Sequence, residues 1–548
     1  MEGKDHTSPI RFLRRALELA WKGRGKVSPN PMVGAVLVKD GKIIGEGFHR
    51  TYGGKHAEAW AIEDAKRKGF SVEGADLYCT LEPCCFTGPE KHQPPCTDLL
   101  IRNRIKRVFL CTLDPHPRVR GKGVRILQEA GIEVQVGILA SQALSLNEGF
   151  FTYQILGRPF VHLKIAQSID GRIAALEGDS RWITDERARK MVHRLRATYD
   201  AVLVGKNTAR VDDPELTVRL VQGRNPYRIV LDTHLELPLS SRIFHLPDPQ
   251  RTIVVTETPT ALPEVFHSEL RGSEALHSEA LNSAVLNSEV RAVQSARASF
   301  EKKRRSLEAL GVRVLEVAQK RQPDSSERSQ TLNPPLELQA GSQAGLQKVL
   351  QEETQASSRA EHHARPPASL LAGPHEGSQT GPQARPPAGL LDLSAVLSRL
   401  GELGIRSILV EGGAKVFTSF LREGLFDRIT FFIAPMVIGK GIEGIGDLGI
   451  RKIAEHLRFE GVRFRRLGNQ LVLDGYRVGF FEDLYKATMP VPHELSATQE
   501  RYFRAADYSN RSGSAPNRES FFSPLITSRA SCFSKIEGAD LSSLGSRR

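Results

Sequence analysis

Four side chains between His56 and Cys96 could bind a metal ion and use it. His56, Cys84 and Cys96 offer one imidazole and two thiols, which are good zinc ligands. A catalytic zinc keeps three protein ligands and one open position, whereas a structural zinc is closed by four. Glu58 follows His56 by two residues, and a carboxylate there suits proton transfer. We therefore predict a catalytic zinc on His56, Cys84 and Cys96, with Glu58 as its acid/base.

Two other interpretations of these cysteines stay open. A zinc ion that only holds loops together would need a fourth protein ligand, which Cys85 or His92 could supply. The cysteines could also be buried side chains that bind nothing. Neither alternative gives Glu58 a role, so we favour the catalytic site.

Composition limits the class of protein. The chain has 548 residues, enough for two or three domains, and 76 Lys and Arg against 63 Asp and Glu, a net charge of +13. The basic charges are spread rather than interleaved with aromatic residues, so we predict no nucleic-acid partner and a phosphorylated small-molecule substrate. The first residues lack the apolar core of a secretory signal, and no apolar run could span a membrane. We expect a cytoplasmic protein, and a homo-oligomer.

Residues 1–150 predict an α/β domain. A helix is expected at 10–22, and Asp40-Gly41 is typical of a hairpin between strands Met32–Val38 and Lys42–Gly47. A helix at 56–68 would place His56 at its start, and a helix beginning at Cys84 would favour the thiolate there. The other predicted elements are strand Asp76–Leu81, helix Cys96–Arg102, strand Arg107–Thr112, helix Val124–Ala130 and strand Ile132–Val136.

A second α/β domain is predicted from 158 to 485. It opens with a strand, an Asp170-Gly171 turn and a returning strand, and continues with buried strands that are typical of a parallel sheet. These are helix Asp185–Ala197, strands Asp200–Gly205, Arg228–Asp232, Thr252–Thr256, Val312–Val317 and Ser407–Gly413, helix Ala414–Arg422, and closing strands Asp427–Ala434 and Leu471–Val478.

Two segments have a biased composition: the first is rich in Ser, Ala, Gln, Glu and Pro, and the second in Ser and Arg. One lies at about 258–390 and has self-similar stretches such as ARPPASLL and ARPPAGLL. We predict that it is a flexible insertion in the second domain, apart from the strand near Val312, because it can bury little apolar area. The other, 486–548, is predicted to be a disordered tail.

The motifs together resemble a known family. HAE, TLEPC and PPC resemble the H-x-E…P-C…C pattern of zinc nucleobase deaminases, and PNPMVGAVLVKDG precedes them. LKIAQSIDGRIA, GDSRWIT, VDDPELTVR and LVEGG follow in the second domain. The chain is similar to the bifunctional riboflavin-biosynthesis deaminase–reductase family over about 8–260 and 390–480. This implies a cytidine-deaminase-like three-layer domain followed by a domain similar to dihydrofolate reductase.

The resemblance also implies the reactions. The family removes an amino group from a ribosylated diaminopyrimidinone 5′-phosphate with zinc, then reduces the ribose to a ribitol chain with NADPH. Asn30 would hold the pyrimidine. The ribose phosphate would meet Ser180, Arg196, Leu216, Arg219 and Glu411. The cofactor would meet Ala166, Trp182, Thr208, Asp212, Thr233 and the turn of Gly413, Ala414, Lys415, Val416, Phe417, Thr418 and Ser419. Lys164 either polarises the sugar carbonyl or faces solvent.

Two rival functions remain: a deaminase with a degenerate second domain, or a zinc-stabilised scaffold without activity. The family motifs in the second domain argue against both. The sequence departs from the family between Cys84 and Cys96, where eleven residues make the loop longer than usual. A surface loop absorbs such an insertion at small entropic cost. We expect the zinc ligands to be retained and the substrate contacts of this loop to differ.

Overall fold

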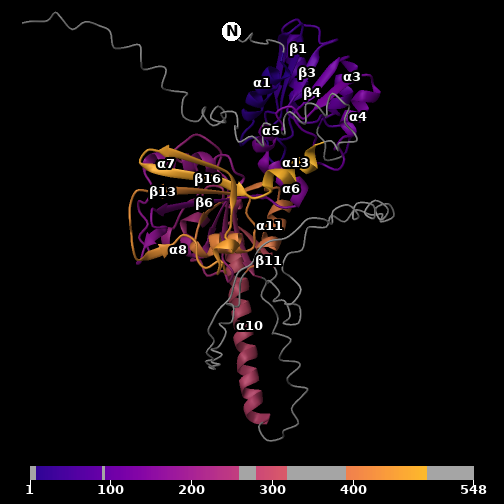
Figure 1. The fold of residues 1–548 in the computed structure, drawn as a ribbon. Helices are drawn as coiled ribbons and strands as arrows, with labels where there is room; N and C mark the ends of the chain where they lie inside the picture. The colour runs from indigo at the N-terminus through magenta and orange to yellow at the C-terminus, as the bar shows by residue number, and fades with distance from the viewer. Residues whose placement is uncertain (1–7, 89–92, 258–278, 318–390, 490–548) are drawn as a thin grey trace, which may run out of the picture. The chain divides into compact units, whose positions relative to one another are not determined.

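The computed structural model describes residues 8–88, 93–257, 279–317 and 391–489, without the side chains of 279–293. The described parts of Met1–Ala318 and Asp392–Arg548 fall in one compact unit that contains two separate large sheets (Figure 1). None of the helices in these parts combines the length and the apolar character that a membrane crossing requires.

The first sheet has five strands in the order β2-β1-β3-β4-β5. β1 is antiparallel to β2 and β3, whereas β3, β4 and β5 are parallel. The strands are β1 (Gly34–Lys39), β2 (Lys42–Phe48), β3 (Asp76–Cys79), β4 (Arg107–Leu110) and β5 (Glu133–Val136). All five strands predicted for this domain are present, most of them shorter than expected.

Helices cover both faces of this sheet, which gives three layers. The alternation of side chains along a strand sends Leu37 and Leu77 to one face, and Val36 and Tyr78 to the other. On the first face pack α2 (Ala57–Arg67), α3 (Cys96–Arg102) and α4 (Lys122–Glu129). On the second pack α1 (Pro9–Trp21) and α5 (Ala140–Leu146), and α6 (Glu148–Leu156) follows α5 along the chain. The predicted three-layer α/β domain is confirmed.

The second sheet has nine strands in the order β11-β10-β9-β8-β12-β6-β13-β16-β15. Seven neighbouring strands from β11 to β13 are parallel, and β16 and β15 continue the sheet antiparallel. The strands are β6 (Phe160–Ser168), β8 (Ala201–Gly205), β9 (Tyr227–Leu231), β10 (Thr252–Glu257), β11 (Arg313–Val317), β12 (Ser407–Gly412), β13 (Arg428–Ala434), β15 (Phe459–Leu467) and β16 (Gln470–Arg477). The predicted α/β class is confirmed here too.

Connections between parallel strands carry the helices of this domain, as parallel pairing requires. They are α7 (Glu186–Arg196), α8 (Lys206–Asp212), α10 (Glu279–Ala309), α11 (Leu393–Glu402) and α12 (Ala414–Arg422), and α13 (Phe480–Thr488) follows the last strand. One local prediction is wrong. The segment after the Asp170-Gly171 turn, β7 (Arg172–Ala175), does not return along β6 but pairs with β14 (Gly441–Glu443) in a separate ribbon.

The prediction that the insertion is flexible is wrong for the part of it that the structure describes. Residues 279–309 form α10, which connects the parallel strands β10 and β11. Leu307 is buried, and Phe300 packs against the same core cluster. A parallel pair needs such a crossover, so a segment that reads as low in complexity is a structural element of the sheet. The repeats at 364 and 384 and the tail from 490 onward lie outside the described residues.

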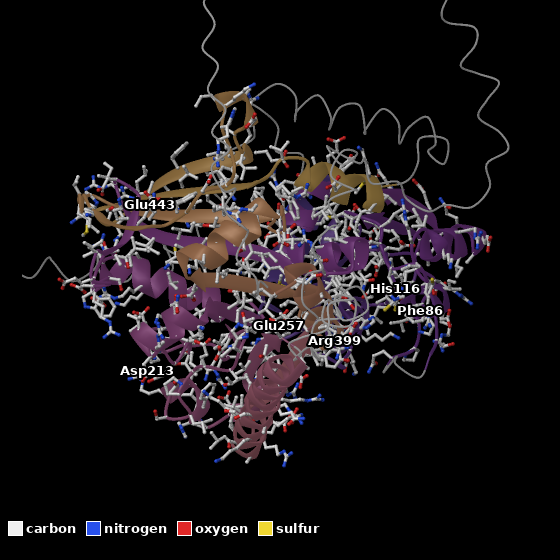
Figure 2. The ribbon with its side chains drawn as sticks, turned by 90° about the horizontal axis from the view of Figure 1, so that it is seen from below. Phe86, His116, Asp213, Glu257, Arg399 and Glu443 are labelled. Carbon is white, nitrogen blue, oxygen red and sulfur yellow. The ribbon has the colours of Figure 1, made fainter. Side chains whose placement is uncertain are left out.

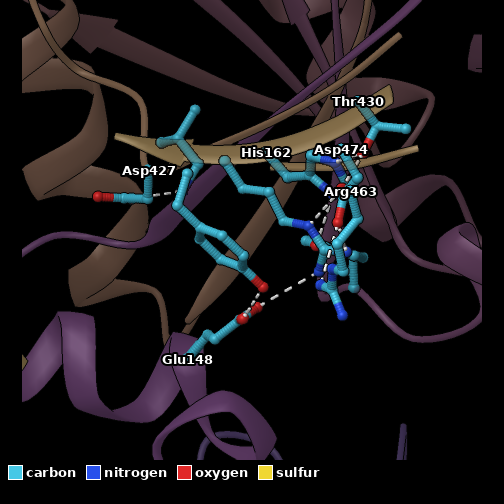
Figure 3. Close-up of polar contacts among 10 residues, drawn as sticks. Glu148, His162, Asp427, Thr430, Arg463 and Asp474 are labelled. Carbon is cyan, nitrogen blue, oxygen red and sulfur yellow. Dashed lines mark hydrogen bonds and ion pairs between the residues drawn. The ribbon is translucent and has the colours of Figure 1, made fainter. Parts of the chain in front are cut away.

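A buried polar network ties α6 to the second sheet (Figure 3). Arg428 binds both oxygens of Asp474, at 2.8 Å from Nε and 2.7 Å from Nη2. The Tyr476 hydroxyl donates to Glu148 of α6, and the Thr430 hydroxyl donates to Asp474 at 2.5 Å. Because these groups are buried, their charges stabilise the fold only as long as the partners stay in place.

Candidate metal and cofactor sites

Three metal-ligating side chains meet at the ends of three segments of the first domain. His56 is the N-cap residue of α2, Cys84 follows β3 by five residues, and Cys96 is the first residue of α3. His56 Nδ1 lies 3.5 Å from Cys84 Sγ and 3.3 Å from Cys96 Sγ. The three ligand atoms all lie within 4.8 Å of one another.

These distances fit a zinc ion. With Zn–N near 2.05 Å and Zn–S near 2.3 Å, tetrahedral angles put nitrogen and sulfur ligands about 3.6 Å apart. The observed separations of 3.5 and 3.3 Å are within a few tenths of that value. One imidazole and two thiols are also a donor set that zinc prefers. Both nitrogen–sulfur separations are therefore compatible with a zinc ion bound between these side chains.

Glu58 stands beside the cluster in the first turn of α2. Its side chain is only 3% exposed. Burial raises the pKa of this carboxyl group, while the charge of His56 opposes that shift. A buried carboxylate next to a metal-ligand cluster can accept and return a proton, which is the role predicted for it.

Cys84 is not at the start of a helix, contrary to the expectation that a helix dipole would favour its thiolate. Residues 82–88 are irregular, and Cys96 begins the helix instead. The Cys96 backbone N–H donates to Cys84 Sγ at 3.4 Å. This hydrogen bond to sulfur stabilises a thiolate at Cys84 in place of the predicted dipole.

The long loop after Cys84 turns its first residues away from the cluster. Cys85 Sγ contacts the Arg118 carbonyl oxygen at 3.6 Å, and Phe86 stacks on His116 with ring centroids 5.6 Å apart (Figure 2). Cys85 is not among the ligands that the described residues bring together. His92, the other possible fourth ligand, lies outside the described residues, as does Lys91.

Cysteine substitutions separate a three-ligand site from a four-ligand one. We expect Cys96→Ser to lose the bound metal, because it removes one of three ligands, and Cys85→Ser to keep it. Metal content per chain after dialysis against a weak chelator measures both. Equal loss from the two variants would mean that Cys85 is a ligand and that the site is structural.

His49 links Asn30 to the metal cluster, and sequence reasoning missed it. His49 Nδ1 lies 3.1 Å from the Lys55 carbonyl oxygen, so this nitrogen donates and Nε2 accepts from Asn30 Nδ2 at 3.2 Å. The His49 ring lies edge-on to the His56 ring, with centroids 5.5 Å apart. Asn30 is thus held close to the cluster. The only sequence signal for this role is His49 itself, at the end of the stretch GEGFH that precedes His56.

Glu82, in the TLEPC motif, organises the backbone behind the cluster. It is 3% exposed and accepts hydrogen bonds from the N–H groups of Asp114, Gly121 and Val124, at 3.0 to 3.2 Å. Burial raises the pKa of Glu82 to about 7. The role of Glu82 could not be predicted from the sequence, because its three partners are distant along the chain. It fixes the strand end from which Cys84 projects.

Most of the predicted cofactor residues lie at one edge of the second sheet. Ala166 is near the end of β6, while Thr208, Thr233 and Gly413 follow β8, β9 and β12. These four strands are parallel, so their carboxyl ends share an edge, which is where α/β sheets bind ligands. Ala414–Ser419 form the first turns of α12, and Asp212 ends α8.

The turn between β12 and α12 packs closely against Thr208 of α8. Gly413 has a φ of 97°, which a side chain would disfavour, and precedes α12. A Cβ on Gly412 would lie 2.7 Å from Cγ2 of Thr208, so the glycine lets the β12–α12 turn approach α8. The backbone N–H groups at the start of α12 can bind a phosphate at this turn.

Trp182, another predicted cofactor residue, is 67% exposed. The Arg189 guanidinium group lies over its ring, 4.4 Å from the ring centroid.

Arg196 and Glu411, both predicted to meet the substrate, bind each other. Arg196 Nε and Nη2 donate to the two carboxylate oxygens of Glu411 at 2.6 and 2.8 Å. The Arg196 guanidinium group, which was expected to meet the substrate phosphate, is therefore already bound to a carboxylate. Its Nη1 donates to the Thr217 carbonyl oxygen at 3.1 Å. Burial lowers the pKa of Lys164, which is half-buried and electrostatically coupled to both residues. Lys164 is thus not a solvent-facing lysine.

The remaining predicted substrate residues lie on two loops. Ser180 is in the segment between β7 and α7, and Leu216 is buried with a φ of 53°. Arg219 is half-exposed, its Nη1 lies 2.5 Å from Glu215, and its backbone N–H donates to His193 Nδ1 at 3.1 Å. Of the two predicted phosphate arginines, Arg219 is the one whose guanidinium faces solvent.

Two family profiles match the chain in the order of its sheets. Residues 7–112 match the cytidine and deoxycytidylate deaminase zinc-binding region, and residues 159–294 and 328–473 match the RibD C-terminal domain. Together with the His-Cys-Cys cluster beside a buried glutamate, they define the class of protein: an enzyme that joins a deaminase domain to a reductase domain.

Several relatives match this chain over nearly their whole length. The riboflavin biosynthesis protein RibD of Aquifex aeolicus is 37% identical over 463 residues, 84% of this chain and 96% of the relative. That of Escherichia coli is 30% identical over 84% of this chain and 97% of its own. A Thermotoga maritima deaminase/reductase structure superposes with a TM-score of 0.58 at 32% identity, covering 86% of this chain and 99% of its own. The chain belongs to the RibD family of riboflavin biosynthesis proteins.

Proposed function

We propose that this chain performs both family steps on 2,5-diamino-6-ribosylamino-4(3H)-pyrimidinone 5′-phosphate: hydrolytic deamination, then reduction of the ribosyl chain by NADPH. The observation that carries the proposal is the cluster of His56, Cys84 and Cys96 within 4.8 Å, beside buried Glu58. The Thermotoga relative is described as a diaminohydroxyphosphoribosylaminopyrimidine deaminase and 5-amino-6-(5-phosphoribosylamino)uracil reductase. We assign deamination to residues 1–150 and reduction to 158–485.

In the deaminase step His56, Cys84 and Cys96 hold zinc, which supplies an activated water when it is bound. Glu58 passes one proton from water to the ring nitrogen, and then a second proton, from the added hydroxyl group, to the amino group, which leaves as ammonia. Asn30 orients the pyrimidine, and its amide is held by His49 at 3.2 Å. The burial of Glu58 keeps bulk water from competing for these protons.

In the reductase step NADPH supplies a hydride when it is bound. The β12–α12 turn from Gly413 to Ser419 holds its phosphates, and Ala166, Trp182, Thr208, Asp212 and Thr233 complete the cofactor surface. Lys164, with its pKa lowered by burial, donates a hydrogen bond to the sugar oxygen that becomes a hydroxyl. Glu411 acts by positioning, since it holds Arg196 and lies within electrostatic reach of Lys164.

The substrate phosphate is assigned to Arg219, with Ser180 and Leu216 shaping the loops around it. We expect Arg219→Ala to raise the KM for the deaminated substrate about tenfold or more, because a charge-assisted contact to phosphate is lost. NADPH affinity should stay unchanged. Steady-state kinetics and a fluorescence titration of NADPH measure the two quantities.

The control for that substitution is Arg242→Ala. Arg242 lies 3.5 Å from the same Glu215 and is similarly exposed, so its loss removes a like charge without touching the assigned position. A weaker NADPH affinity in Arg219→Ala, or the same rise of KM in both variants, would show that Arg219 does not bind the substrate phosphate.

The enzyme assay that tests the proposal follows ammonia release and NADPH oxidation by the same preparation. Ammonia should form without NADPH, and NADPH should be consumed only after deamination. Removal of zinc with a chelator should stop ammonia release while leaving NADPH oxidation on the already deaminated substrate. A chain that releases no ammonia when loaded with zinc would contradict the proposal.

A further inference from the structure

A cavity of about 810 Å³ lies outside the two assigned catalytic sites. Its walls come from the segment Trp21–Met32 after α1, from Ser145–Phe150 at the α5–α6 junction, from α7 and the residues after it, and from β15 and β16. Asn30 is its one lining residue that the deaminase reaction above uses.

The walls of this cavity carry excess positive charge. Seven arginines line it against three carboxylates, which leaves four positive charges in excess. The arginines are Arg24, Arg187, Arg194, Arg406, Arg428, Arg463 and Arg465, and the carboxylates are Glu148, Asp200 and Asp474. Such an excess in a concave site attracts anions.

The three carboxylates are already engaged. Asp474 is bound by Arg428 and, at 3.2 Å, by Arg463 (Figure 3). Glu148 accepts from the Tyr476 hydroxyl, and Asp200 binds Arg224, which is not part of the wall, at 2.5 Å. Little negative charge is left for the other arginines.

Five lining arginines form no ion pair with any carboxylate in the described part of the chain: Arg24, Arg187, Arg194, Arg406 and Arg465. Arg24 is the clearest case. Its Nε is buried without a hydrogen-bond acceptor, and its guanidinium lies over the Trp21 ring at 4.5 Å. The pKa of Arg24 is lowered to about 10, mainly by burial and in part by the charges of Arg428 and Arg194, so these cations lie within electrostatic reach. Arg24 still carries its charge at neutral pH.

We propose that this cavity binds the phosphate group of a phosphorylated small molecule, with Arg24 and Arg194 as its principal ligands. Guanidinium groups suit phosphate because each can donate more than one hydrogen bond to its oxygens. The cavity also offers aromatic surface at Trp21 and Phe150, on which a heterocycle can stack.

The occupant we assign is the deaminated pyrimidine phosphate on its way from the first site to the second, and this assignment rests on the proposed function. Asn30 belongs both to the cavity wall and, through His49, to the surroundings of the metal cluster. A product that leaves Asn30 therefore meets the basic cavity. A separate phosphorylated metabolite has the same chemistry, so the test must distinguish the two.

The test compares Arg24→Gln/Arg194→Gln with Arg125→Gln, an exposed arginine on α4. Without phosphate and at low salt, the double variant should melt no lower than wild type, since it relieves repulsion between like charges. Its affinity for inorganic phosphate, by calorimetry in an Arg219→Ala background that removes the reductase phosphate contact, should fall about tenfold or more. Arg125→Gln should bind phosphate as wild type does.

Coupled turnover then identifies the occupant. With the diaminopyrimidinone substrate and NADPH, the double variant should release a larger share of free deaminated intermediate than wild type or Arg125→Gln. An unchanged share together with lost phosphate affinity would overturn the transit role and assign the cavity to a separate metabolite. Unchanged phosphate affinity would overturn the site itself. Absence of ammonia from wild type would contradict the proposed function, and the phosphate titration would still decide the site.

Discussion

Glu58→Gln is expected to reduce the deamination rate about 10²- to 10⁴-fold, the range that a positioned general acid/base contributes. The amide keeps the size of the side chain and fills the same buried space beside Cys96. It cannot carry the two protons that must be passed in turn to the ring nitrogen and to the leaving amino group. The rate is measured as ammonia release from the diaminopyrimidinone substrate.

Two controls make this result specific. Metal content per chain should be unchanged, because Glu58 is not among the clustered ligands. Reduction of the already deaminated substrate should proceed at the wild-type rate, since that step is assigned to the second sheet. A Glu58→Gln protein that deaminates normally, or one that loses its metal, would show that the carboxylate has a different role.

Asp474→Ala is expected to destabilise the fold by roughly 3–5 kcal/mol, the cost of leaving a buried charge without its partner. Asp474 is 5% exposed and accepts two hydrogen bonds from Arg428, one from Arg463 and one from Thr430. Its removal leaves the Arg428 guanidinium in a buried position without its bidentate partner, while the ion pair with Glu148 is longer, at 3.7 Å. Chemical unfolding monitored by circular dichroism gives the difference.

Glu73→Ala is the matched control. Glu73 pairs with Arg104 at 2.9 Å, but both side chains are well exposed, so its loss should cost at most about 1 kcal/mol. If the two substitutions cost the same, the Asp474 network does not stabilise the fold in the way its burial indicates.

The same network sets a dependence on pH. Burial alone would raise the pKa of Asp474, but the charge of Arg428 outweighs it and the net shift is downward. A carboxyl group with a lowered pKa stabilises the folded state above the pKa of the unfolded chain, near 4, and loses this contribution as pH falls towards its folded pKa. The stability gap between wild type and Asp474→Ala should therefore narrow below about pH 4.

The metal ligands could be found from the sequence because their chemistry is local. His56 and Glu58 share one helix turn, and Cys96 starts the next helix on the same face of the sheet. The positions of strands could be predicted for the same reason, since buried runs such as Ala201–Gly205 are continuous in sequence. The fold class followed from their alternation with helices.

Contacts between distant residues could not be predicted in this way. The bidentate pair of Arg196 and Glu411 joins positions 215 residues apart, and it changes which arginine can meet a phosphate. Glu82 binds three N–H groups more than 30 residues away, from the loop before α4 and from the first turn of α4. The helix α10 was not predicted, because its composition resembles that of a flexible segment and it has no strong apolar pattern. Its role depends instead on joining two parallel strands.

The most direct test of the bifunctional account is mass analysis of the products formed from the diaminopyrimidinone substrate, with and without NADPH. Without NADPH, the product should have exchanged one amino group for an oxygen and kept its ribosyl chain. With NADPH, it should also carry one added pair of hydrogens on that chain. Unchanged substrate in both reactions, or a deaminated product that NADPH never converts further, would contradict the account.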